Sequence, residues 1–307
     1  MRRSCCGLLV LASLFCAPRA YGASPTEGCA ACDAGCAATA VQPTVRRSGS
    51  WIIEDTENFS ICRPANYQSR PDLAAAVEKV RAELCKSWLC EEDRKAWNPR
   101  CQIVIHGRLE GYIKEVGPGA RQTTGSSLID FDKDQVVLRR IDIRGDRADW
   151  FTEALPHEMT HVVLADRFTH VQIPHWADEG MAIQADPVAK QRLHGRDLRA
   201  AVAAGGEFRL AELLTLDSYP HPSRMGAFYG QSASLVDFLM RVGSKEQLVT
   251  FVLTATDQGY DVALREVYDI AGVGALEQQW RRHLRGLPVE REISTSEAPS
   301  QAVASME

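Results

Sequence analysis

The segment Leu155-Pro-His-Glu-Met-Thr-His161-Val-Val-Leu contains the pattern H-E-x-x-H, two histidines flanking a glutamate at fixed spacing. On a helix, four steps of about 100° bring His157 and His161 to one face, one turn apart. Two imidazoles so placed can hold one zinc ion, each at about 2.0–2.1 Å. Glu158 projects about 100° round from His157. A carboxylate beside a metal in this way can take a proton from water.

Pro156 lies inside this segment, where a proline could break a helix. With Thr152 as the N-cap, however, Pro156 is the fourth helical residue, and its missing N–H is one of the four that lack an intrahelical partner. The proline therefore predicts a nearby helix start. Three apolar residues follow His161, at 162–164, and predict that the helix continues into a core.

A zinc site also needs a third protein ligand and leaves a fourth position open to water. The segment Pro174-His-Trp-Ala-Asp-Glu179-Gly-Met-Ala-Ile is predicted to be a second helix, because proline favours the first helical position. Glu179 is the predicted ligand, and Gly180 would let this helix approach its neighbour closely. Asp178 and His175 are alternative ligands. Asp178 lies about 100° round from Glu179 and is better placed to accept a hydrogen bond from a ligand histidine.

These two motifs together resemble the gluzincin clan of zinc metallopeptidases. H-E-x-x-H followed by W-x-x-E-G-x-A is most similar to the bacterial peptidase MA-like group of exported proteins. The resemblance covers about residues 130–285. It implies a zincin-like fold, with an active-site cleft between a sheet-containing lobe and a helical lobe. It also implies one zinc per chain, held by His157, His161 and Glu179, with Glu158 as the general base.

A third segment, Phe228-Tyr-Gly-Gln-Ser, resembles the Y-x-x-G helix start of the aminopeptidase-N-like branch of this clan. The resemblance implies that the Tyr229 hydroxyl stabilises the oxyanion, with Ser232 in place of the glycine. A core tyrosine on an amphipathic helix is the alternative, and His221 is a second candidate for the role. The G-x-M-E-N motif of that branch is absent, so aminopeptidase activity is not expected.

Composition and periodicity indicate an α+β fold. The chain has 307 residues, 45% of them hydrophobic and 24% charged, which is typical of globular proteins. Up to residue 144 strand and helix patterns mix, whereas after residue 150 the apolar spacing is almost entirely helical. The patterns predict a helix over 73–88 and strands over 51–53, 59–61, 102–106 and 135–144.

The N-terminus has the features of a secretory signal peptide. Two arginines precede the apolar run Gly7–Ala17, which is too short to span a bilayer. Before Ala23, the small residues Ala20 and Gly22 occupy the positions that a signal peptidase requires. We therefore predict that residues 1–22 are removed near Gly22/Ala23 and that the mature chain is exported and has no transmembrane segment.

The remaining chain divides by composition into three parts. Residues 23–50 are rich in small residues and are predicted to be a flexible linker, or a pro-segment. Residues 51–289 are predicted to form the catalytic domain, and residues 290–307 a disordered tail. The net charge of −5 argues against nucleic acid as a partner, and the oligomeric state is left open.

Export favours disulfide bonds, and seven of the ten cysteines lie outside the predicted signal peptide. An odd number leaves one thiol unpaired. Spacing suggests bridges between Cys90 and Cys101 and between Cys62 and Cys85, although connectivity cannot be derived from sequence. Three cysteines remain, namely Cys29, Cys32 and Cys36. We predict that they form local disulfides and not a metal cluster, although one of them could cap the zinc.

The combined interpretation is an exported zinc metallopeptidase, with an endopeptidase favoured over an exopeptidase. An extended substrate would pair with a sheet edge, either 126–132 or 135–144. Two other classes stay open: a non-catalytic binding protein that keeps the zincin scaffold, and a zinc hydrolase of a non-peptide bond. The intact Glu158 argues against the former, because a purely structural zinc needs no base.

Overall fold

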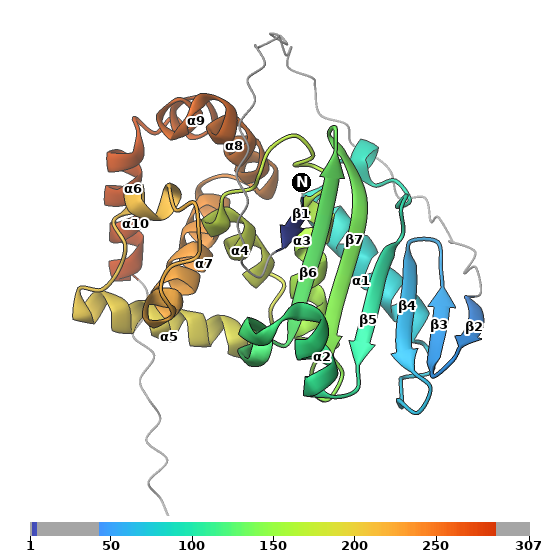
Figure 1. Cartoon of the computed structure of the whole chain (residues 1–307). Coiled ribbons are helices and arrows are strands. Elements are labelled where there is room, and N and C mark those ends of the chain that lie inside the picture. Colours follow the sequence, from blue (N-terminus) through green and yellow to red (C-terminus); the bar gives the residue numbers. More distant parts are fainter. Residues whose placement is uncertain (1, 5–42, 287–307) are drawn as a thin grey trace, which may run out of the picture.

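The computed structural model describes residues 2–4 and 43–286, and shows a sheet with packed helices followed by a helical region (Figure 1). The seven strands of the described residues form one mixed sheet in the order β1-β6-β7-β5-β4-β3-β2. Their bounds are β1 (Arg2–Ser4), β2 (Thr44–Ser48), β3 (Trp51–Asp55), β4 (Phe59–Pro64), β5 (Cys101–His106), β6 (Gly125–Asp132) and β7 (Gln135–Arg144).

Two of the α-helices lie between strands, and the others follow β7 along the chain. They are α1 (Leu73–Trp88), α2 (Leu109–Val116), α3 (Ala154–Leu164), α4 (His175–Ile183), α5 (Val188–Ala204), α6 (Leu210–Leu214), α7 (Met225–Val242), α8 (Lys245–Gln258), α9 (Tyr260–Tyr268) and α10 (Val273–Gly286). Three short 3-10 helices complete the described elements: η1 (Glu91–Asp93), η2 (Pro118–Gln122) and η3 (Pro222–Arg224). The arrangement confirms the predicted α+β class and is consistent with a zincin-like fold.

One face of the sheet is buried against helices. Strands β4, β5 and β7 run parallel to one another, and the fully buried Ile61, Ile103 and Ile141 lie in register across them. Because strand side chains alternate between faces, these residues point toward α1 and α3. The β-branched residues at these positions suit a covered sheet, which explains why the sequence pattern predicted these strands.

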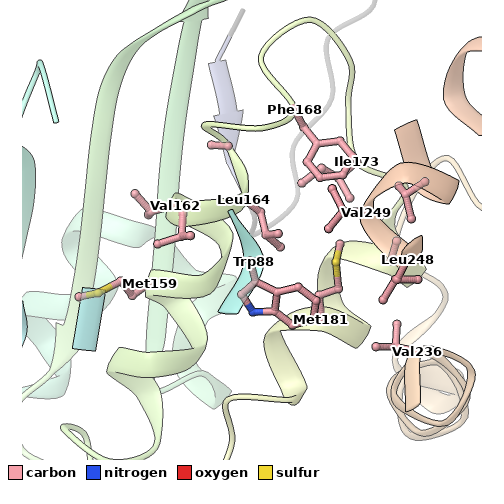
Figure 2. Packing of buried hydrophobic residues seen from close by; sticks show 14 of the residues in the cluster. Trp88, Met159, Val162, Leu164, Phe168, Ile173, Met181, Val236, Leu248 and Val249 are labelled. Carbon is pink, nitrogen blue, oxygen red and sulfur yellow. The ribbon is translucent and has the colours of Figure 1, made fainter. Parts of the chain in front are cut away.

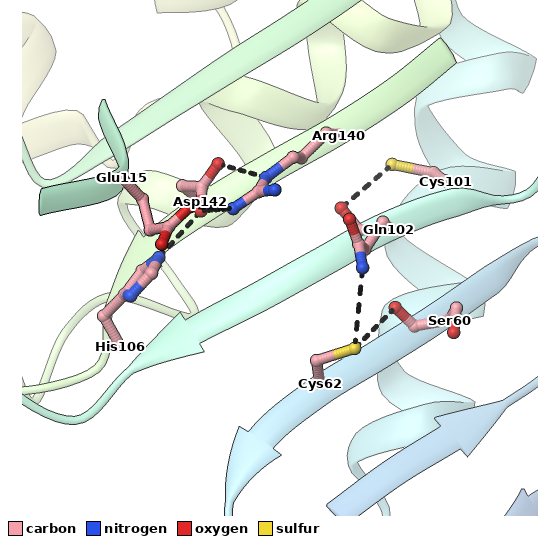
Figure 3. A network of polar contacts seen from close by, with 8 residues as sticks. All are labelled: Ser60, Cys62, Cys101, Gln102, His106, Glu115, Arg140 and Asp142. Carbon is pink, nitrogen blue, oxygen red and sulfur yellow. Dashed lines mark hydrogen bonds and ion pairs between the residues drawn. The ribbon is translucent and has the colours of Figure 1, made fainter. Parts of the chain in front are cut away.

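The opposite face of the sheet carries a polar network (Figure 3). His106 Nε2 lies 2.7 Å from Oδ1 of Asp142, and the Arg140 guanidinium donates to the same carboxylate at 2.7 and 2.8 Å. Cys62 is on this face too, where the amide of Gln102 donates to its Sγ at 3.9 Å. The two faces of the sheet therefore differ sharply in polarity.

A continuous hydrophobic cluster joins the sheet to the helical region. Figure 2 shows Met159 and Val162 on one side of α3 and Leu164 on the side of Met181 of α4, with Val236 of α7 beyond. Helix α3 contacts β6 and β7 on one side, and α1 and α4 on the other. This central place in the core fixes the orientation of the H-E-x-x-H segment.

Strand β6 lies next to the short edge strand β1, whereas β7 is interior to the sheet. Arg2–Ser4 form β1, which pairs antiparallel with β6 along Leu128–Asp130. Most of the predicted signal peptide and linker falls outside the described residues, and so does the predicted tail at 290–307. The linker prediction was wrong for residues 44–48, which form the exposed edge strand β2 through backbone pairing with β3.

Cys62, Cys85 and Cys101 are free thiols, so neither of the two suggested bridges is formed. Cys62 lines the polar face of the sheet, whereas Cys85 belongs to the core on the other face. Cys101 is completely buried, whereas Cys90 is exposed. Within the described residues, no helix is long and apolar enough to cross a bilayer.

Candidate metal centre

The structure brings His157, His161 and Glu179 together. One ligand atom from each of them lies within 4.8 Å of the others. The two imidazole centroids are 5.1 Å apart, as expected for residues one turn apart on a helix. His157 Nε2 lies 3.5 Å from Oε2 of Glu179, which belongs to the neighbouring helix α4.

Local sequence explains why α3 presents its histidines here. The helix begins at Ala154 with Glu153 as the N-cap, one residue later than the predicted Thr152. Pro156 is thus the third helical residue, where its missing N–H removes no intrahelical hydrogen bond. From residue 162 to 164 the side chains are fully buried, so the apolar end of α3 anchors the helix in the core.

Helix α4 is held against α7 by a close approach at Gly180. A Cβ atom there would lie 2.6 Å from the backbone oxygen of Ser232 and 2.6 Å from Cγ2 of Val236. Only glycine allows this distance without displacing α7. The neighbouring Glu179 is 4% exposed and is therefore positioned by rigid packing on both sides.

Each histidine has an aspartate beside its other nitrogen. Nδ1 of His161 lies 2.7 Å from Oδ1 of Asp178, as the 100° offset of Asp178 from Glu179 suggested. Nδ1 of His157 lies 3.2 Å from Oδ1 of Asp186. Carboxylates that orient ligand histidines in this way raise their basicity and fix the ring.

Sequence reasoning did not identify Asp186. Its side chain is 0% exposed, and Lys190 forms an ion pair with it at 2.9 Å. His194 Nε2 lies 3.8 Å from the other carboxylate oxygen. Asp186 lies in the turn between α4 and α5, so helical spacing does not relate it to Glu179 and no sequence pattern marks it.

Tyr219 is a second residue that sequence reasoning missed. Its hydroxyl donates a hydrogen bond of 2.5 Å to Oε1 of Glu179. This contact occupies one carboxylate oxygen and leaves the other, Oε2, facing His157. His175, an alternative ligand by sequence, stacks on the Tyr219 ring with centroids 4.7 Å apart, and its Nε2 lies 3.3 Å from the carbonyl of Asp217.

The charges around the cluster favour a cation. Burial lowers the pKa of both imidazoles, but contacts with Asp186 and Glu179 outweigh this and raise the pKa of His157 to about 10. Asp178 likewise raises the pKa of His161 to about 9. Burial raises the pKa of Glu179, yet its contact with His157 lowers that pKa overall, to about 2. The buried carboxylates therefore stabilise positive charge strongly at this point.

The donor set fits zinc. Two imidazole nitrogens and one carboxylate oxygen are a common ligand set of catalytic zinc sites, which keep a fourth position open. Atoms about 2.1 Å from a shared tetrahedral ion lie about 3.4 Å from one another. The observed 3.5 Å between His157 Nε2 and Glu179 Oε2 matches this spacing.

Glu158 lies beside this group and next to the first residue of β6. A Cβ atom on Gly125 would lie 2.6 Å from Cγ and 3.0 Å from Oε1 of Glu158. The side chain is half-buried, so its carboxylate is not sealed from solvent. The start of β6 and the expected general base are therefore direct neighbours.

The two residues expected at the oxyanion belong to α7 and to the segment just before η3. Tyr229, on α7, packs against the rings of Phe228 and His194, with centroids 5.4 and 5.7 Å away. His221 is exposed, and its Nδ1 accepts from the backbone N–H of Ser223 at 3.3 Å, which caps η3. Their catalytic roles stay predictions.

Comparison with known protein families identifies a match. The sequence profile of the Peptidase MA superfamily matches residues 123–286, just over half of the chain. The matched region runs from β6 to the end of α10 and contains the whole candidate metal centre. No curated protein matches the chain.

Proposed function

Because the chain belongs to the Peptidase MA superfamily, we propose that it is a zinc-dependent peptidase that cleaves bonds within peptide or protein substrates. The observation that carries this proposal is the group His157, His161 and Glu179, with ligand atoms within 4.8 Å of one another. Glu158, adjacent in sequence to the first of them, supplies the base that a purely structural zinc site would not need.

Each residue of the site has a distinct role in the proposed reaction. His157, His161 and Glu179 would hold one zinc per chain, which supplies Lewis-acid polarisation of a carbonyl and acidification of water. Glu158 would take the proton from the attacking water and deliver it to the leaving nitrogen. Asp178 and Asp186 keep the imidazoles oriented through their Nδ1 atoms.

We further propose that substrate pairs with the outer edge of β6. The alternative strand 135–144 is interior to the sheet, whereas β6 has an edge on which Arg2–Ser4 add as an antiparallel strand. That pairing supports the idea that an extended peptide fits there by β-addition. Because β6 begins at Gly125, next to Glu158, a peptide along this edge would lead toward the base.

The same proposal includes export of the mature chain. Its support is the sequence alone, namely the two arginines, the short apolar run Gly7–Ala17 and the small residues before Ala23. N-terminal sequencing of the exported protein would test it, with Ala23 expected as the first residue. A protein retaining Met1 in the exported fraction would contradict it.

The function is tested by measuring metal content and cleavage on one preparation. We expect about one zinc per chain, and new peptides of defined sequence when the protein acts on a mixed protein digest read by mass spectrometry. A zinc chelator should abolish cleavage, and added zinc should restore it. Cleavage that survives complete zinc removal contradicts the proposal, as does full zinc occupancy without cleavage of any peptide bond.

A further inference from the structure

A second concave surface lies in the helical region, apart from the candidate metal centre. It is a groove of about 680 Å³ along α5, bordered by α7 and the end of α10. We call it the α5 groove. Its lining includes apolar side chains of all three helices and two glycines, and its principal apolar members are Val188, Leu198, Val202 and Leu284.

The floor of the α5 groove is open because a glycine, Gly195, contributes no side chain there. Gly195 lies in the middle of α5, and a Cβ on it would meet only an atom of the flexible Arg199 side chain, at 3.5 Å. Along the same helix, Val188 is 63% and Val202 41% exposed. Exposed apolar residues at both ends of a helix face, with a gap between them, leave a stripe that is available to bind another apolar surface.

The rim of the α5 groove is strongly basic. Its lining contains four arginines and one aspartate, a net charge of +3 with His283 neutral, in a chain whose net charge is −5. The aspartate, Asp237, is already paired with Arg241 at 2.7 Å and lies 3.9 Å from His283. The other arginines of the lining are Arg192, Arg199 and Arg285.

We propose that the α5 groove binds an acidic amphipathic segment of a partner protein. An apolar stripe of the segment would cover the floor between Val188 and Val202, and its carboxylates would meet the arginine rim. Charge complementarity selects this occupant, because a basic rim around an apolar floor suits a segment whose apolar stripe is flanked by acidic residues. The negative net charge of the whole chain disfavours an anionic membrane as the occupant.

The test uses the full chain and two labelled synthetic peptides as long as α5, 17 residues. One has leucines at helical spacing with glutamates elsewhere, and the other is a scrambled version of identical composition. We expect the periodic peptide to bind in a fluorescence anisotropy titration, more weakly as salt is added. The scrambled peptide should bind at least about tenfold more weakly, because it cannot present one apolar stripe.

Matched charge reversals locate the binding. The double variant Arg199→Glu/Arg285→Glu should weaken binding of the periodic peptide by at least about tenfold. The control Arg47→Glu/Arg121→Glu makes the same change in net charge on exposed positions outside the groove and should leave affinity within about twofold. Circular dichroism of both variants verifies that they fold, since these side chains are exposed.

Several outcomes would overturn the proposal. Equal loss in both double variants would mean that only net charge matters, and no binding of the periodic peptide would remove the docking surface. Binding to anionic lipid vesicles in place of the peptide would assign the groove to a membrane. Displacement of the probe by an unlabelled peptide of residues 287–307, at lower concentration than the unlabelled probe itself, would assign it to the chain's own C-terminal segment.

Discussion

Oδ1 of Asp186 lies 3.2 Å from Nδ1 of His157, on the opposite side of the imidazole from Glu179. The aspartate side chain is fully buried and is balanced by Lys190. The pKa of Asp186 is lowered well below its usual range, because contacts with His157 and His194 outweigh the effect of burial. Asp186 is therefore an ionised group that both orients His157 and adds negative charge to the metal centre.

The first prediction concerns this contact. Asp186→Asn should weaken zinc binding by about 10- to 100-fold, because amide replacement removes the charge and loosens the ring orientation of His157. A zinc titration against a competing chelator measures the affinity. Asp197→Asn, on helix α5, is the control and should bind zinc as the unmodified chain does. Equal affinities in the two variants would show that Asp186 does not support the ligand.

The second prediction separates the two neighbouring acids of α4. Glu179→Ala should weaken zinc binding far more than Asp178→Ala, because Glu179 faces His157 directly whereas Asp178 contacts Nδ1 of His161. We expect the Asp178 variant to lose about 10- to 100-fold in affinity. The same zinc titration measures the affinities of the Glu179 and Asp178 variants. The reverse order of affinities would exchange the two roles.

The third prediction concerns the packing that positions Glu179. Gly180→Ala should destabilise the fold by about 1–3 kcal/mol, because its methyl group would overlap the backbone of Ser232 on α7. Gly274→Ala is the matched control, since Gly274 lies in α10 with nothing within 4 Å of the added atom. That change should stabilise by up to about 1 kcal/mol. Urea unfolding measures both, and similar effects at the two positions would contradict the close approach.

The fourth prediction is a pH dependence of stability at the polar face of the sheet. Burial raises the pKa of Asp142, but hydrogen bonds from His106 and Arg140 lower it overall. A carboxyl group whose pKa is lower in the folded state stabilises the fold above its unfolded pKa, about 3.9. That stabilisation is lost as the pH falls through the lower, folded-state pKa.

Asp142→Asn should therefore reduce the free energy of unfolding at pH 7 by about 1–3 kcal/mol and flatten its dependence on pH below about 4. Asp132→Asn, at the exposed end of β6, is the control and should keep both the stability and the slope. Urea unfolding across the acidic range measures them. An unchanged slope in the Asp142 variant would assign the acid sensitivity to other carboxylates.

Local periodicity was enough to predict much of this site. The spacing of His157 and His161 on one helical face depends only on helix geometry, and so does the offset that aims Asp178 at His161. Strand β7 and helix α1 were predicted with the bounds they have, because apolar patterns mark them from end to end. In these cases the information lies within a few consecutive residues.

Contacts between distant segments could not be predicted in this way. Tyr219 reaches Glu179 from a segment between α6 and η3 that has no repeating pattern. Asp186 reaches His157 from the turn between α4 and α5, where Lys190 of α5 pairs with it. The suggested bridge from Cys62 to Cys85 failed because the sheet separates their faces, and that separation depends on the strand register.

The most direct test of the account is Glu158→Gln, assayed for zinc and for peptide-bond hydrolysis on the same preparation. Glutamine keeps the shape of the side chain beside Gly125 but removes its basicity. We predict unchanged zinc content and a loss of hydrolysis by at least about 100-fold. Undiminished hydrolysis by the zinc-loaded variant would contradict the assignment of Glu158 as the base and, with it, the proposed mechanism.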